Sequence, residues 1–85
     1  MKQFIEFAKK NGLRFEDYSG TEITFSDIML FKNDVFVDIT QKNDTFDVRV
    51  EKGIGEKYDV LYEAHFIKEQ FVFETIKEYL LKDNI

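Results

Sequence analysis

The segment that most constrains the fold runs from Val35 to Val50, VFVDITQKNDTFDVRV, and has the pattern of two β-strands joined by a turn. Apolar side chains occupy every second position in both arms, as in strands that bury one face. The two apolar sets share a face if Thr40 pairs with Thr45 across a four-residue connection. In this register Asp38 lies directly opposite Asp47 on the other face, where like charges destabilise a ladder.

The tripeptide Lys-Asn-Asp occurs twice, beginning at Lys32 and at Lys42, each time between two strand-like runs. Asn and Asp tolerate left-handed backbone angles and bond to their own main chain, so both copies predict turns in an antiparallel meander. If the first copy makes a two-residue turn, Phe31 lies opposite Phe36. A three-residue loop brings aliphatic residues of the preceding run there instead, and either choice leaves an apolar cluster around Phe36 on the acidic face.

The remaining segments predict an α+β domain over residues 1–85, in which helices at both ends pack against an antiparallel meander of three or four strands. Gly12 is the residue type expected where the first helix closes. In chain order, we expect a helix over 1–11, an edge strand or an ordered loop over 13–18, a β-rich run over 21–31 with a bend at 26–27, the hairpin arms, a glycine turn over 52–56, a strand over 58–66 and a helix over 68–82.

The apolar cluster around Phe36 has two interpretations. In the first, one of the helices, the N-terminal one, lies over the cluster and makes a three-layer sandwich, because soluble monomers seldom leave such patches bare. In the second, the cluster and the acids form a docking surface, with apolar anchors ringed by carboxylates. The alternating pattern is compatible with both.

Charge and composition narrow the classes of partner. Seventeen acidic residues against twelve basic ones give a net charge of −5, which argues against a nucleic-acid or anionic-membrane binder and favours a basic protein partner. The chain order is similar to that of the double-stranded RNA-binding fold, but the lysine cluster of that fold is missing, which excludes the class. No cysteine and no long apolar run occur, so we expect a cytoplasmic protein without a membrane span.

Residues suited to catalysis are few. His65 is the only histidine, and Gly53-Ile54-Gly55 lacks the Lys-Ser/Thr of a phosphate loop. Asp38 and Asp47 are the best carboxylate pair, which could share a proton, bind a hard cation with Glu51 or Thr40, or await a basic partner. Alternatively they belong to a solvated face on which Arg49, diagonally across, relieves the repulsion. We expect no enzymatic activity, no cofactor and no resident metal.

These observations predict a small acidic binding protein that presents an acidic, partly apolar surface to a basic partner, such as a nucleic-acid-handling enzyme. Small acidic inhibitors of this kind occur among phage and mobile-element products, including anti-CRISPR proteins, and the placement rests on size and charge alone. The alternatives are an immunity-type protein that neutralises a basic toxin, and a structural subunit, such as a homodimer, that associates through its sheet. The predicted partner-binding residues are Asp38, Asp47, Phe36, Glu51, Asp59 and Glu63.

Overall fold

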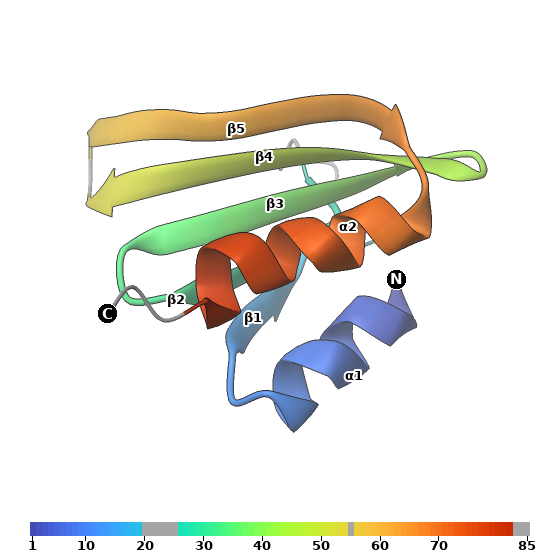
Figure 1. Cartoon of the computed structure of the whole chain (residues 1–85), viewed down its shortest axis with the longest axis horizontal. Helices are drawn as coiled ribbons and strands as arrows, with labels where there is room; N and C mark the ends of the chain where they lie inside the picture. The colour runs from blue at the N-terminus through green and yellow to red at the C-terminus, as the bar shows by residue number, and fades with distance from the viewer. Residues whose placement is uncertain (20–25, 55, 83–85) are drawn as a thin grey trace.

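The computed structural model describes residues 1–19, 26–54 and 56–82, and it confirms the predicted α+β order. Five strands form one antiparallel sheet in the order β1-β2-β3-β4-β5, with a helix at each end of the chain (Figure 1). The predicted strand at 21–25 lies outside the described residues. The elements are α1 (Lys2–Lys10), β1 (Arg14–Asp17), β2 (Ile28–Lys32), β3 (Val35–Lys42), β4 (Thr45–Ile54), β5 (Lys57–Ile67), α2 (Glu69–Ile76) and a π-helical extension of α2, η1 (Lys77–Leu81).

The segment after the first helix is an edge strand, which settles the choice that the sequence left open. β1 pairs with β2 in antiparallel register, from Arg14 opposite Phe31 to Asp17 opposite Ile28. The helix before it closes with the predicted glycine. Gly12 has φ 69°, and the N–H of Leu13 donates to the carbonyl of Ala8 at 2.8 Å, as in a Schellman motif.

Both Lys-Asn-Asp copies make the same two-residue turn, and this corrects the predicted register of the central hairpin. Asn33 and Asn43 each have φ 57°, the left-handed conformation that two-residue hairpin turns require. Lys42 therefore pairs with Thr45, and the β3–β4 register moves by two residues from the predicted one. A shift of two preserves the faces of the strands but changes every cross-strand partner. Consequently Asp38 lies opposite Arg49, and the direct Asp38–Asp47 pair does not form.

Both helices lie on the same face of the sheet, so the predicted three-layer sandwich is wrong (Figure 1). Phe4 of α1 is fully buried. The centre of its ring lies 5.3 Å from that of Phe46 on β4 and 4.9 Å from that of Phe73 on α2. One core therefore holds both helices to the inner face. It consists of Phe4, Ala8, Leu13, Ile28, Leu30, Val37, Ile39, Phe46, Val48, Val50, Val72, Ile76 and Leu80.

The last strand is irregular where the sequence alternation predicted a regular one. Val50 pairs with Tyr62 but Glu51 pairs with Val60, so Leu61 is an extra residue in β5. A bulge of this kind reverses the alternation of side chains along the strand. Asp59, which lies opposite Lys52, is therefore on the helix side of the sheet, so this predicted partner-binding residue does not share the outer face with Glu63.

Candidate functional site

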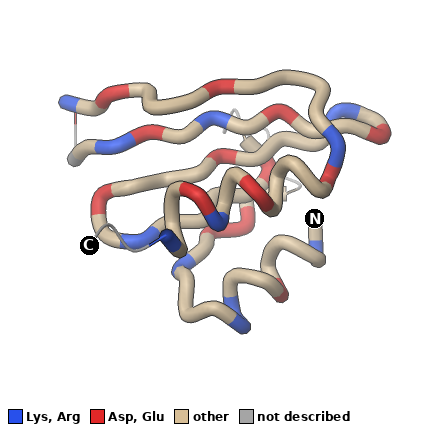
Figure 2. The backbone as a smooth tube through the Cα atoms, viewed as in Figure 1, with Lys and Arg blue, Asp and Glu red and all other residues tan. Residues whose placement is uncertain are grey.

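The outer face of the sheet, which the described helices leave uncovered, carries three rows of side chains that cross the strands, and the row nearest the β3–β4 turn places Thr40 opposite Asp47. The middle row places Asp38 opposite Arg49, and Arg49 opposite Glu63. The row on one side of it places Phe31 opposite Phe36, as the two-residue turn predicts, and Phe36 opposite Glu51. The two phenylalanine rings stack at 5.4 Å. Acidic residues occur along each of β3, β4 and β5, and lysines lie at the ends of β4 and β5 (Figure 2).

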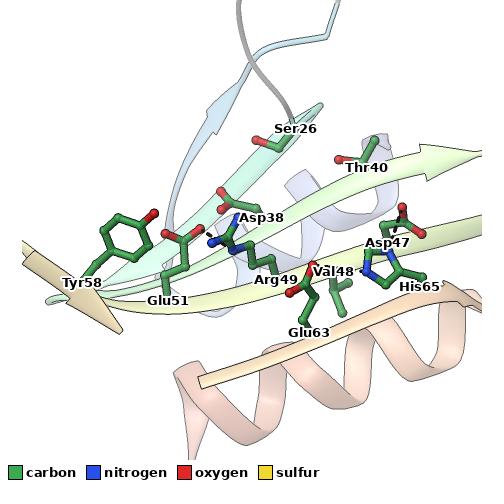
Figure 3. A pocket seen from close by; sticks show the side chains of 10 residues that line it. All are labelled: Ser26, Asp38, Thr40, Asp47, Val48, Arg49, Glu51, Tyr58, Glu63 and His65. Atoms are coloured by element: carbon green, nitrogen blue, oxygen red, sulfur yellow. Dashed lines mark hydrogen bonds and ion pairs between the residues drawn. The ribbon is translucent and has the colours of Figure 1, made fainter. Parts of the chain in front are cut away.

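These rows border a groove of about 520 Å³ on the outer face, which we call the outer groove (Figure 3). Val48 reaches its edge, and Ser26 and Thr40 line it from the β2 and β3 side. Four carboxylates and only two basic side chains line it. These charged side chains are Asp38, Asp47, Glu51, Glu63, Arg49 and His65, and the ring of Tyr58 closes one end.

Asp38 and Glu51 are hydrogen-bonded neighbours in this groove. Burial of Asp38, a hydrogen bond with the Glu51 side chain and the charge of Glu51 together raise the pKa of Asp38 to about 7, although Arg49 opposes the shift. The Nε of Arg49 lies 3.5 Å from Oε1 of Glu51, and its guanidinium lies 5.9 Å from the centre of the Tyr58 ring. One guanidinium therefore lies near both carboxylates, and Asp38 remains partly protonated near neutral pH.

His65 bridges two carboxylates at the other end of the groove. Its Nδ1 lies 3.2 Å from Oδ2 of Asp47, and its Nε2 lies 3.2 Å from Oε1 of Glu63. Both ring nitrogens can donate at once only when the imidazole is protonated. The hydrogen bond to Asp47, and secondarily Glu63, accordingly raises the pKa of His65 above its usual value.

Asp47 also fixes an unusual backbone. Its Oδ1 accepts the backbone N–H of Phe66 at 3.0 Å, and this bond holds the pKa of Asp47 below its usual range. Phe66 has φ 57°, a left-handed conformation that is an outlier for a bulky side chain, and its ring is 73% exposed. The carboxylate therefore replaces the ladder hydrogen bond that a regular strand would supply at this position.

The structure brings most of the predicted residues together but arranges them differently. Asp38, Asp47, Glu51 and Glu63 line the outer groove, and Phe36 lies beside it on the same face. Asp59 lies on the other face. Sequence reasoning missed Tyr58 and Phe66, because the bulges that place them come from pairing with β4 and leave no periodic signal. The Asp38–Asp47 repulsion that first suggested a cationic partner does not exist, since Arg49 and His65 stand beside these carboxylates.

Within the described ranges, no three His, Asp or Glu side chains form a group that could hold a metal ion. No described helix is long and apolar enough to cross a membrane. No protein-family model, curated protein or solved structure matches the chain. The functional argument therefore rests on the geometry and charge of the outer face.

Proposed function

We propose that this protein is a non-enzymatic binding protein whose outer groove receives a cationic side chain, arginine or lysine, from the surface of a basic protein partner. The partner class that fits best is a nucleic-acid-handling enzyme, because such enzymes carry the positively charged grooves that an acidic sheet complements. Phages and other mobile elements use acidic inhibitors of this size against defence enzymes, as in anti-CRISPR proteins. An immunity protein against a basic toxin would use the same surface.

The observation that carries the proposal is the raised pKa of Asp38 beside Glu51, in a groove where Arg49 is already present. Burial, and secondarily Glu51, keep the carboxyl group of Asp38 partly protonated near neutral pH, and additional positive charge beside it would favour its ionised form. A guanidinium or ammonium group from a partner would supply that charge and displace the proton. Binding should therefore release a proton and strengthen as the pH rises through about 7.

The test is affinity capture from the native host with the wild-type protein and two charge-matched variants. The groove variant carries Asp38→Asn, Glu51→Gln and Glu63→Gln. The control variant carries Glu6→Gln, Glu69→Gln and Glu74→Gln, which removes three carboxylates from exposed helical positions and no less charge than the groove variant, because Asp38 is partly protonated near pH 7. We expect the wild type and the control to capture the same basic protein at roughly 0.05 M salt and to release it at roughly 0.3 M, because salt screens such attraction.

The groove variant should capture about tenfold less of that protein, and wild-type capture should be weaker at pH 6 than at pH 8. If the groove variant and the control captured equal amounts of the partner, the proposal would be overturned. The groove carboxylates would then contribute no more to binding than carboxylates elsewhere on the surface. Circular dichroism and thermal melts of both variants confirm that the comparison is between folded proteins.

A second candidate function, acid–base catalysis, is favoured by the same carboxyl pair, since a pKa near 7 suits proton transfer at neutral pH. The two groups share a hydrogen bond, so they are closer than the roughly 5–9.5 Å that separates the carboxylates of glycoside hydrolases. A panel of chromogenic esters, phosphates and glycosides tests this candidate. Turnover that Asp38→Asn abolishes would support it, and turnover equal to the buffer background would reject it.

A further inference from the structure

The free edge of β5 is the most exposed part of the described sheet. β5 spans eleven residues and pairs with β4 on one side only among the described strands (Figure 1). Along it, Tyr58, Val60, Leu61, Tyr62 and Phe66 are all exposed. A long edge with apolar side chains is a template for the backbone of another strand, because its outward N–H and C=O groups have no ladder partner.

Natural edges are usually protected by lysine, proline or a short length. β5 has one lysine, Lys57 at its first residue, and no proline, and its central charge is acidic, Glu63 (Figure 2). Its irregularities at Leu61 and at 65–66 interrupt the edge but leave a regular stretch from Tyr62 to Ala64 between them. The edge is therefore open to pairing over a stretch comparable to a short natural strand.

The two faces beside this edge differ in chemistry. On the outer side, Glu63 is one of the four carboxylates that line the outer groove. On the helix side, the ring of Tyr62 stacks on that of Tyr79 at 6.0 Å and remains 40% exposed. Because successive residues of a strand point to opposite faces, an added strand would meet Glu63 with the side chains on its outer side and Tyr62 with those on its helix side.

Phe66 supplies a candidate anchor at the end of the edge. Its left-handed backbone is held by Asp47, and its ring projects into solvent. A strained conformation that exposes a large aromatic side chain suits a recognition residue better than a core residue.

From this geometry we propose that an extended segment of alternating basic and apolar residues in the partner adds to β5 as a sixth strand, with Phe66 as an apolar anchor. The inference rests on the proposed function and names how the basic partner engages. A second copy of this chain fits less well, because each copy has a net charge of −5 and like charges repel.

Hydrogen–deuterium exchange with a synthetic peptide tests the proposal. The probe is an alternating Lys-Val peptide of about eight residues, and the control is a Glu-Val peptide of the same length. We expect the Lys-Val peptide alone to bind, and to slow exchange at alternate amides of β5, whose N–H groups point outward, while leaving β1 unchanged.

Two variants distinguish a specific role of Phe66 as an anchor from non-specific hydrophobic binding of the peptide. Phe66→Ala should lower the affinity for the Lys-Val peptide about tenfold. Phe71→Ala, which removes a 44% exposed ring from α2, should leave that affinity unchanged. A different result would be that the peptide binds without changing hydrogen exchange in β5 and that the groove variant abolishes this binding. This result would overturn the sixth strand and leave the proposed function intact.

The other outcomes also decide. Failure of the Lys-Val peptide to bind at any salt concentration would overturn the sixth strand, and the capture experiment would judge the proposed function separately. Slowed β5 exchange that depends on protein concentration without peptide would assign the edge to a second copy and overturn the proposed occupant. Sedimentation velocity at the same concentrations would verify that dimer.

Discussion

Phe66 donates its backbone N–H to Oδ1 of Asp47 at 3.0 Å, nineteen residues away in the sequence, and this bond holds a phenylalanine in a left-handed conformation. The other oxygen of the same carboxylate lies 3.2 Å from Nδ1 of His65. One side chain thus fixes the backbone at one end of β5 and the charge state of the only histidine. Four predictions follow from this pair and from its neighbours on the outer face.

Replacing Phe66 by glycine should stabilise the protein. Glycine adopts φ 57° without the steric cost that a side chain bears, and a ring that is 73% exposed loses little burial when it is removed. We expect the free energy of unfolding to rise by about 0.5–1 kcal/mol, measured by urea denaturation. Phe71→Gly, in the helix α2, should lower it by about 1 kcal/mol. A loss of stability in Phe66→Gly would show that the conformation is not strained.

The pKa of His65 should lie above 6.5 in an NMR titration, which is unambiguous because the chain has one histidine. Asp47→Asn should lower this pKa substantially, and Glu63→Gln should lower it less, because the Asp47 bond is the larger cause. A raised histidine pKa means that its contribution to stability is complete below 6.5 and is lost as the pH rises through the folded-state pKa. An unchanged pKa in Asp47→Asn would contradict the bridge.

The contribution of Asp38 to the pH dependence of stability should have the opposite sign to that of an ordinary salt-bridged acid. Its pKa is about 7 in the folded protein against 3.8 for the free side chain, so the folded state binds more protons between these values. Stability should therefore fall as the pH rises from about 4 to about 7, by about 1–2 kcal/mol after allowance for solvent screening at this half-buried site. Asp38→Asn should remove that part of the pH dependence, measured by urea denaturation at pH 5 and pH 8.

Asp47→Asn is the matched control for this measurement, because the pKa of Asp47 is lowered and not raised. The contribution of Asp47 to stability is present above its unfolded-state pKa and is lost as the pH falls through its lower folded-state value. Asp47→Asn should thus change the pH profile below about pH 4, where Asp38→Asn has little effect, and between pH 5 and pH 8 it should act only through the lowered pKa of His65. Parallel profiles would mean that the two carboxylates occupy equivalent environments.

Gly53 should tolerate no side chain, whereas Gly12 should tolerate one at moderate cost. Gly53 has φ 149°, and a Cβ there would lie 2.2 Å from the carbonyl oxygen of Lys57 and 2.6 Å from the Cα of Tyr58, both backbone atoms. We expect Gly53→Ala to cost about 2–3 kcal/mol. Gly12 has φ 69° and open space around it, so Gly12→Ala should lower the free energy of unfolding by about 1 kcal/mol. Thermal melts of the two variants compare them, and equal costs would contradict the close approach of β4 and β5.

The order of elements and the two faces of the central strands were predictable from the sequence alone. The alternation of Val37, Ile39, Val48 and Val50 with polar residues placed the buried face correctly even though the register was wrong, because a shift of two residues leaves the faces unchanged. The repeated Lys-Asn-Asp turn also located both hairpins. The pairing of Phe31 with Phe36 followed from the shorter of the two turns that the sequence allowed.

Which carboxylates meet, by contrast, was decided by tertiary structure. The left-handed Asn43 shortened the turn and gave Asp38 the partner Arg49, so that Glu51 and not Asp47 became the carboxyl group that is hydrogen-bonded to Asp38. The bulge at Leu61 turned Asp59 to the other face. Alternation and turn chemistry are properties of neighbouring residues, whereas register, bulges and the choice of one face by both helices depend on contacts between residues far apart in the chain.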